Sequence, residues 1–326
     1  MKILVTGGAG YIGSHAVYLL IEKGYNVVIV DNMSKGYESN IHPNAKFYKA
    51  DIRDEKELER IFTIEKDIYS VIHFAGLIVV PESVSKPLEY FNNNTYGVEI
   101  LLKVCTKFNI KHFVFSSTAA VYGEPKNIPI LETDIKEPIN PYGESKLAAE
   151  ALIRGWANAN NSNYIIFRYF NVAGTHENGK IGIRTLKPTH LLPCVVKSAI
   201  DSQTFTVMGT DYETKDGSCV RDFVHVVDLV EAHIIGLEWS IKNNKSDIFN
   251  LGSGEGYSVL EVLNKAIETL AIKIPYELGS RREGDPEKLY ANTGKVNSIL
   301  NWIPKISLAH MITTEYYFRK KLTNKE

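Results

Sequence analysis

Short apolar runs alternate with amphipathic segments along the first half of the chain. The amphipathic segments space their apolar residues at helical intervals, as in residues 12–20 and 55–66, and the first of them ends at Gly24. This alternation predicts βαβ units, and therefore a doubly wound parallel sheet in an α/β protein. The runs that predict its strands are residues 3–6, 27–30, 46–50, 70–74, 112–116 and 164–169.

The alternation fades after about residue 171, where prolines and glycines interrupt the pattern. The sequence therefore predicts two parts: a sheet domain over residues 1–171, joined again by a segment near 224–250, and a smaller α/β lobe over residues 172–326. Sheets of this kind bind ligands at the carboxyl ends of their strands, so we expect the lobe to shape a substrate pocket there.

One predicted helix, residues 88–108, carries apolar side chains on two sides. Such a helix is usually buried on more than one side, and the sheet covers only one of them. The other side meets either a second element of the same chain or a partner subunit, and the pattern favours neither.

The composition is that of an ordinary globular protein. Of 326 residues, 44% are hydrophobic, and 37 basic against 38 acidic side chains give a net charge of −1. This balance provides no electrostatic footprint for nucleic acid or an anionic membrane surface, and no apolar stretch approaches the length of a membrane span. Cys105, Cys194 and Cys219 lack the spacing of a zinc site, which predicts reduced thiols, no bound metal and a cytoplasmic location.

A glycine-rich segment, GGAGYIG at residues 7–13, lies between the first predicted strand and the first predicted helix. Glycines allow a tight turn and let backbone N–H groups approach a pyrophosphate at the positive end of a helix. The segment has the dinucleotide-binding pattern of a Rossmann-type fold. The residues expected to contact the dinucleotide here are Gly7, Gly10, Tyr11, Ile12 and Gly13.

Two acidic residues at strand ends suit the adenosine half of a dinucleotide. Asp31 ends the second predicted strand, where a carboxylate accepts hydrogen bonds from both ribose hydroxyls. Asn32 follows in place of the basic residue that a 2′-phosphate would require, so NAD is favoured over NADP. After the third strand, Asp51 and Ile52 are candidates for the adenine edge, although Asp51 is nearly as good a helix N-cap.

Tyr142 and Lys146 are four residues apart in a segment that Asn140 and Pro141 open as a helix, so phenol and ammonium share one face. A free tyrosine has a pKa of about 10, and its ionisation at neutral pH costs about 4 kcal/mol. Both Lys146 and a positively charged nicotinamide ring would lower that cost. Thr118, which follows a predicted strand, is a candidate to exchange a hydrogen bond with a substrate hydroxyl.

Seven motifs, in order along nearly the whole chain, resemble the UDP-glucose 4-epimerases, a family of extended short-chain dehydrogenases/reductases. The early motifs are shared across that superfamily, whereas the last two are typical of a nucleotide-sugar pocket. The motifs are GGAGYIG at 7–13, HFAG at 73–76, SSTAAVYG at 116–123, NPYGESK at 140–146, RYFNVAG at 168–174, VRDFVHV at 220–226 and RREGD at 281–285.

The resemblance implies an isomerase that inverts the 4-hydroxyl of a UDP-hexose through a transient 4-keto sugar, with NAD bound throughout turnover. Tyr142 as phenolate would take the hydroxyl proton while hydride passes to NAD⁺, and Thr118 would assist. Lys146 would bind the nicotinamide ribose. The other cofactor contacts that the resemblance implies are Phe74, Ala75, Gly76, Asn93 and Phe170.

According to the same resemblance, the smaller lobe holds the UDP-sugar. Its arginines would face the diphosphate, because a guanidinium pairs with phosphate through a planar fork. Three positions depart from the family pattern: Phe223 replaces a tyrosine, His190 an asparagine, and Ile78 a lysine that contacts the cofactor. The substrate contacts implied, besides Thr118, are Asn171, His190, Leu191, Arg221, Phe223, Arg282, Asp285 and Leu289.

Leu289 bears on the choice of sugar. In the family, the matching position faces the sugar ring, where a large aromatic residue excludes a 2-acetamido group. Leu289 predicts room for that group, so that UDP-GlcNAc and UDP-GalNAc join UDP-glucose and UDP-galactose as substrates, whereas a register error of one residue would place Tyr290 there. The resemblance also implies a homodimer, in which the helix over 88–108 and the helix from Pro141 pack against their symmetry mates.

Other activities of this fold are alternatives. A 4,6-dehydratase needs an acid and a base directly after Thr118, where this chain has Ala119 and Ala120, which transfer no protons. Principal activity on UDP-GlcNAc, or a UDP-glucuronate 4-epimerase or decarboxylase, stays open. A non-catalytic NAD-sensing regulator is disfavoured because both Tyr142 and Lys146 are present.

Overall fold

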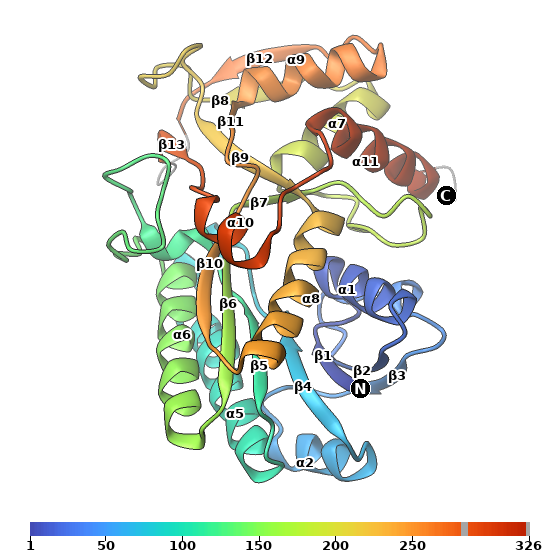
Figure 1. Cartoon of the computed structure of the whole chain (residues 1–326). Helices are drawn as coiled ribbons and strands as arrows, with labels where there is room; N and C mark the ends of the chain where they lie inside the picture. The colour runs from blue at the N-terminus through green and yellow to red at the C-terminus, as the bar shows by residue number, and fades with distance from the viewer. Residues whose placement is uncertain (282–285, 324–326) are drawn as a thin grey trace.

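The computed structural model in Figure 1 describes residues 1–281 and 286–323. Seven strands within them form one parallel sheet: β1 (Lys2–Thr6), β2 (Asn26–Asp31), β3 (Lys46–Lys49), β4 (Ile68–His73), β5 (His112–Ser116), β6 (Asn163–Tyr169) and β10 (Asp247–Leu251). Their order is β10-β6-β5-β4-β1-β2-β3, so the strand order reverses between β1 and β4. That reversal is where doubly wound sheets bind ligands. The predicted α/β fold with a doubly wound parallel sheet is confirmed.

Helices cover both faces of this sheet, because its central strands bury apolar side chains on both sides. One face packs against α1 (Tyr11–Glu22), α8 (Val226–Asn243) and α10 (Gly294–Leu300). The other face packs against α2 (Glu55–Ile64), α5 (Gly97–Lys107) and α6 (Pro141–Asn160). The second half of the chain thus contributes α8, α10 and β10 to the large sheet and its covering.

The rest of the second half forms a smaller lobe next to the carboxyl ends of the large sheet, at the top of Figure 1. The short strands β7 (Asn171–Ala173) and β13 (Lys288–Leu289) run parallel to β9 (Val220–His225), and β11 (Gly256–Ser258) runs antiparallel to it. A second pair joins β8 (Phe205–Met208) and β12 (Tyr276–Gly279). The apolar core of the lobe lies among α7 (Leu191–Asp201), α9 (Val259–Leu270) and α11 (Leu308–Thr323).

The predicted helix over 88–108 is not uniform. After the short α3 (Val80–Ser85), α4 (Pro87–Phe91) continues into a wider, π-helical turn at Asn92–Tyr96 and then into α5. Both apolar sides of α5 are buried within the chain, because α2 and α6 flank it. The structure therefore supports the intrachain alternative for its second side. Across residues 1–281 and 286–323, every helix falls short of the length and apolar character that crossing a membrane requires.

Candidate active site

The glycine-rich loop makes a close-packed turn between β1 and α1. A Cβ at Gly7, whose φ is +71°, would lie 2.6 Å from the backbone nitrogen of Ala75, and a Cβ at Gly13 would lie 2.1 Å from the carbonyl oxygen of Gly7. α1 begins at Tyr11 with Gly10 as its N-cap, and no side chain of the described residues caps it. The first N–H groups of α1 are therefore available as donors to a pyrophosphate, and the residues present fit a dinucleotide.

Asp31 is fixed beside this loop at the end of β2. Its Oδ2 accepts a hydrogen bond from the backbone N–H of Ala9 at 3.0 Å, and its Oδ1 accepts one from Met33 at 2.8 Å. Each carboxylate oxygen keeps a further lone pair with which to accept from a ribose hydroxyl. Asn32 Nδ2 donates to Asp51 Oδ2 at 3.0 Å, which ties the end of β2 to the end of β3.

Asp51 does not cap α2, so that alternative is wrong. The N-cap is Asp54, whose side chain accepts from the backbone N–H of Glu57 at 3.1 Å, because the helix begins three residues after the position that the sequence offered. The Arg53 guanidinium instead binds both oxygens of Asp51 at 2.7 and 2.8 Å and holds the pKa of that carboxyl well below its usual range. Ile52 is buried against the backbone of α5.

The segment after β4 leads from the glycine-rich loop toward the predicted catalytic residues. Ala75 lies against Gly7, and a Cβ at Gly76 would lie 3.3 Å from Lys146 Nζ. Phe74 is anchored at the start of this segment by its backbone N–H, which donates to the carbonyl of Thr6 at 3.0 Å. The carboxyl ends of β1 and β4 thus form one continuous edge with the Lys146 ammonium.

Asn94, which the sequence did not single out, holds this segment in place. Its side chain is buried and hydrogen bonds with both the N–H and the carbonyl of Leu77, at 2.9 and 3.0 Å, and it donates to Ser145 Oγ at 3.1 Å. The predicted cofactor contact Asn93 is its neighbour and donates to it at 3.0 Å. The run Asn92–Asn94 carries no signal that distinguishes the buried member.

Tyr142 and Lys146 lie on one buried face of α6, at the end of β5. The helix starts as predicted, with Asn140 accepting from the N–H of Gly143 at 2.9 Å and with proline at the first position. Lys146 Nζ donates to the carbonyl of Ser116 at 2.8 Å, and Tyr142 forms a hydrogen bond with Thr118. The three predicted catalytic residues are therefore brought together.

The electrostatics of this group differ from the expectation. Burial raises the pKa of Tyr142, and the hydrogen bond with Thr118 opposes that effect. Burial also lowers the pKa of Lys146 to about 8, while the charge of Glu150 opposes it. Within the chain alone the pKa of Tyr142 stays raised, so the positive charge of a nicotinamide ring would have to add to that of Lys146 to bring the phenol toward ionisation.

The sugar side of the site is assembled from β7, β9 and β13. Asn171 Nδ2 donates to the carbonyl of Asp222 at 3.2 Å, and Arg221 is paired in register with Leu289 of β13. The Leu289 and Phe170 side chains pack on one apolar cluster, which is formed by residues 119, 121, 122 and 130. That cluster directly follows Thr118 in the chain, so Leu289 packs on the turn that Thr118 caps.

Five other predicted substrate contacts are covered by the lobe core, lie at the start of α7, or fall outside the described residues. Phe223 is only 2% exposed, and its ring packs within the core of the lobe, so its contact with a substrate stays a prediction. His190 is exposed and precedes α7, and Leu191 begins that helix. Arg282 and Asp285 lie outside the described residues.

A buried ion pair behind the catalytic residues was also missed. Arg168 of β6 donates through Nε and Nη2 to the two carboxylate oxygens of Glu150, at 2.9 and 2.6 Å. Ser117 Oγ donates to Glu150 Oε1 at 2.6 Å. Glu150 lies one helical turn beyond Lys146, and that spacing was the signal that could have found it.

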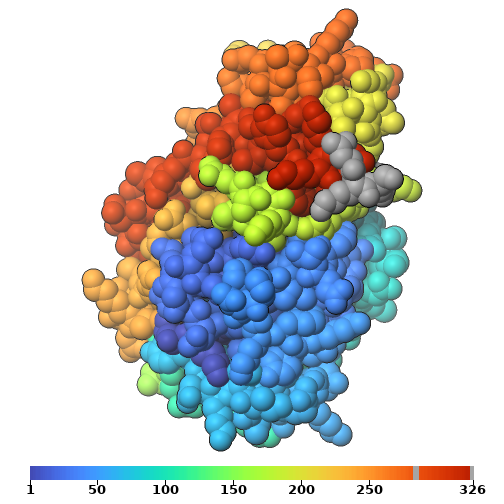
Figure 2. All heavy atoms as spheres, turned by 90° about the vertical axis from the view of Figure 1, so that its right-hand side faces the viewer, coloured from blue at the N-terminus to red at the C-terminus, as the bar shows by residue number. Residues whose placement is uncertain are grey.

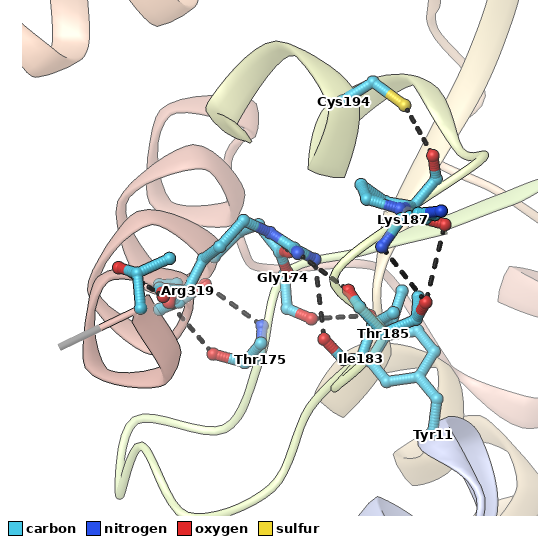
Figure 3. A network of polar contacts seen from close by, with 12 residues as sticks. Tyr11, Gly174, Thr175, Ile183, Thr185, Lys187, Cys194 and Arg319 are labelled. Atoms are coloured by element: carbon cyan, nitrogen blue, oxygen red, sulfur yellow. Dashed lines mark hydrogen bonds and ion pairs between the residues drawn. The ribbon is translucent and has the colours of Figure 1, made fainter. Parts of the chain in front are cut away.

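A segment from Gly174 to residue 190 connects the two sides of the site. Figure 2 shows this stretch, in yellow-green, between the blue N-terminal part and the red C-terminal helix. The Tyr11 hydroxyl donates to the carbonyl of Gly174 at 2.5 Å, and Arg319 of α11 donates to the carbonyl of Thr185 at 3.1 Å (Figure 3). The glycine-rich loop and the stretch that ends at His190 are thereby fixed to each other.

A parallel sheet with a dinucleotide cradle at its reversal point, and a Tyr–Lys pair at the neighbouring strand end, define an enzyme of the extended short-chain dehydrogenase/reductase class. The model of the NAD dependent epimerase/dehydratase family matches residues 3–252, and the chain belongs to that family.

Similar proteins cover the chain almost end to end. The UDP-glucose 4-epimerase of Lactobacillus helveticus is 48% identical over 307 residues, which are 94% of this chain and 92% of that protein. The crystal structure of a UDP-glucose-4-epimerase from Stenotrophomonas maltophila, with bound NAD and formylated UDP-arabinopyranose, has a TM-score of 0.97 at 34% identity and full coverage of both chains. The UDP-glucose 4-epimerase from Bifidobacterium longum, in complex with NAD⁺ and UDP, has a TM-score of 0.92 at 39% identity, again with full coverage of both chains.

Proposed function

We propose that this chain is an NAD-dependent epimerase that inverts the 4-hydroxyl of a UDP-hexose and interconverts UDP-glucose and UDP-galactose. The observation that carries the proposal is the meeting of Tyr142, Lys146 and Thr118 at the end of β5, next to the cradle formed by Gly7 and Gly13. The relatives that cover the whole chain are UDP-glucose 4-epimerases, and solved structures among them hold NAD.

Bound NAD would supply the hydride chemistry, as a hydride acceptor and donor at the sugar carbon. The chain supplies the proton chemistry around that transfer. Thr118 orients the 4-hydroxyl, and Tyr142 takes its proton and later gives it back. Lys146 holds the nicotinamide ribose and adds a positive charge beside the phenol.

The binding roles divide along the two sides of the site. On the cofactor side, the N–H groups at Gly10–Gly13 hold the pyrophosphate, and Asp31 holds the adenosine ribose. On the sugar side, we assign Asn171, His190, Leu191 and Arg221 to the UDP group, with Arg282 and Asp285 in the same role by motif alone. This division matches the proposed domains, residues 1–171 with a returning segment for NAD and residues 172–326 for the UDP-sugar.

The position of Leu289 supports a wider range of sugars. Leu289 and Phe170 both pack on the apolar cluster that follows Thr118, whereas the ring of Tyr290 lies 3.0 Å from where a Cβ of Gly256 would be, on the far strand β11. This arrangement favours Leu289 over Tyr290 as the residue at the sugar. A leucine leaves more space than an aromatic ring, so the proposal includes UDP-GlcNAc and UDP-GalNAc as substrates.

The assembly and location belong to the same proposal. The resemblance assigns the helix over 88–108 to a dimer interface. Three apolar side chains in or just before this segment are exposed: Val84, Leu88 and Tyr96. We therefore propose a homodimer. The proposed cytoplasmic location rests instead on the composition and on the spacing of the cysteines. Light scattering at micromolar concentration tests the homodimer directly, and a particle of 36.6 kDa would contradict it.

A panel of UDP-sugars tests the proposed activity. Purified protein is incubated with UDP-galactose, UDP-GalNAc and UDP-glucuronate in turn, and the products are separated by ion-pair chromatography. Conversion of UDP-galactose to UDP-glucose is expected. A 4-keto-6-deoxy product would identify a dehydratase instead, turnover of UDP-glucuronate alone would identify the alternative epimerase or decarboxylase, and no product from any of them would contradict the proposal.

A further inference from the structure

Three side chains on one face of α6 hold the three residues that leave β5. Tyr142 forms a hydrogen bond with Thr118, and Lys146 Nζ donates to the carbonyl of Ser116. Glu150, one turn further on, accepts a hydrogen bond from Ser117 Oγ at 2.6 Å. Tyr142 and Lys146 take part in the proposed reaction. Glu150 lies on the same face but has no part in the proton transfer itself.

Both carboxylate oxygens of Glu150 accept hydrogen bonds from other side chains of the protein. Its side chain is 1% exposed, and its two oxygens take both arms of the Arg168 guanidinium. Arg168 also donates to the Tyr122 hydroxyl at 3.0 Å, so its own position is fixed. A buried ion pair adds little net stability compared with apolar side chains of similar volume. Stability is therefore a weak reason for a charged pair directly behind Ser117 and Lys146.

We propose that Glu150 is a positioning residue for the active site: its charge keeps the buried Lys146 in the ammonium form, and its hydrogen bond to Ser117 fixes the turn that carries Thr118. The catalytic consequence rests on the proposed function, whereas the effect on Lys146 is a property of the chain alone.

Because Lys146 is buried, the negative charge of Glu150 has a large effect on its protonation. Burial lowers the pKa of Lys146 to about 8, and Glu150 is the group that opposes the lowering. Removing an opposite charge at close range shifts a pKa by about one to three units, which would leave much of Lys146 neutral at pH 7. The other titratable or charged groups around the pair are His73 on β4, Tyr90, Tyr122, Lys136, Tyr142 and Arg154, and Tyr164, Arg168 and Tyr169 on β6.

Titration of Lys146 in the cofactor-free protein tests the charge directly. The ¹⁵Nζ resonance of Lys146 in lysine-labelled protein is assigned by its absence in Lys146→Met. In Glu150→Gln, the midpoint of its titration is expected to fall by about one pH unit or more. Glu144→Gln is the matched control, because it removes the same charge from an exposed position of the same helix and should leave the midpoint unchanged. Equal midpoints in Glu150→Gln and the wild-type protein would overturn the proposal.

Activity separates the two parts of the role. In Glu150→Gln, the alkaline limb of the pH profile of kcat should move to lower pH with the Lys146 titration. In Ser117→Ala, which keeps the charge but removes the hydrogen bond, kcat should fall while the alkaline limb stays in place. A uniform loss of kcat with an unchanged limb in Glu150→Gln would mean a structural role only, and would overturn the proposal.

The role of Glu150 can be tested even if Glu150→Gln does not fold or if the wild-type protein has no epimerase activity. If Glu150→Gln does not fold because Arg168 is left unpaired, the double variant Glu150→Gln/Arg168→Met removes both charges. The Lys146 midpoint is then expected to fall by less than in the single variant, because the Arg168 cation that disfavours the ammonium is lost as well. A midpoint equal to that of the wild-type protein would overturn the proposal. If the wild-type protein converts no UDP-sugar, the proposed function fails, but the titration of Lys146 still decides whether Glu150 controls its charge.

Discussion

The two sides of the site are built by different means. On the cofactor side, the groups that we propose to face the dinucleotide are mostly backbone atoms at the ends of β1, β2 and β4, and their positions follow from the close packing of Gly7 and Gly13. On the sugar side, the side chains that we assign to the sugar nucleotide come from strands that pair with one another, β7, β9 and β13, although Asn171 and Leu289 are far apart in the sequence. Backbone packing tolerates almost no change of volume, whereas converging side chains can be exchanged one at a time. We therefore expect substitutions on the first side to abolish binding and those on the second to change its selectivity.

Tyr142 lies between the two sides and should be separable from both. Tyr142→Phe removes the proton acceptor without touching the glycine-rich loop, so turnover should fall by about 10²- to 10⁴-fold while NAD stays bound. The measurement pairs the epimerisation rate with the NAD content of the purified protein, read after denaturation. Turnover close to that of the wild-type protein would contradict the assignment of Tyr142, and loss of NAD would show that the catalytic residue is not separable from the cofactor side.

Gly13→Ala tests the claim that the cofactor side depends on backbone packing. The added Cβ would lie 2.1 Å from the carbonyl oxygen of Gly7, a backbone atom that cannot move aside on its own. We expect loss of bound NAD and a fall of about 1–3 kcal/mol in the free energy of unfolding. Gly155→Ala in α6 is the control, since no atom lies within 4 Å of its Cβ position, and it should keep NAD and be stabilised by up to about 1 kcal/mol.

The same contrast explains which parts the sequence could predict. The large sheet and the glycine-rich loop were predicted because their signals are local: the apolar run at residues 112–116 coincides with β5, and the glycines stand directly between strand and helix. The Tyr142–Lys146 pair was predicted for the same reason, because four residues on one helix fix which side chains share a face.

The smaller lobe gave much weaker signals. β7 and β13 have three and two residues, too few to show an alternation of apolar and polar positions. Phe223 pairs in register with Asn171, yet its ring is covered by the lobe core, and a strand covered on both faces does not reveal in its own sequence which side chain meets a ligand. Contacts between distant segments, such as Arg168 with Glu150, depend on the finished fold.

Leu289→Tyr tests the claim that the sugar side sets selectivity. The larger ring should occupy the corner beside Phe170 and exclude a 2-acetamido group, so that kcat/KM for UDP-GalNAc falls by about tenfold or more relative to UDP-galactose. NAD content should not change. Leu278→Tyr on β12, an exposed position of the same lobe, is the control and should leave the ratio as it is. Wild-type protein that converts UDP-galactose but not UDP-GalNAc would already contradict the open pocket.

The smallest expected effect concerns the point where the two sides are joined. Tyr11 contributes its backbone to the cofactor side, and its buried hydroxyl donates to the carbonyl of Gly174, at the start of the segment that ends at His190 (Figure 3). Tyr11→Phe removes this one hydrogen bond and keeps the ring, so the free energy of unfolding should fall by about 1 kcal/mol, with more if the carbonyl stays without a donor. Because the glycine-rich loop itself is unchanged, NAD should still bind, but the bond that fixes the loop to the sugar side is gone, so bound NAD should dissociate faster. Thermal unfolding and the rate of NAD release measure the two effects. A loss of stability with no change in the rate of NAD release would mean that this hydrogen bond stabilises the fold but does not affect how the cofactor side holds NAD.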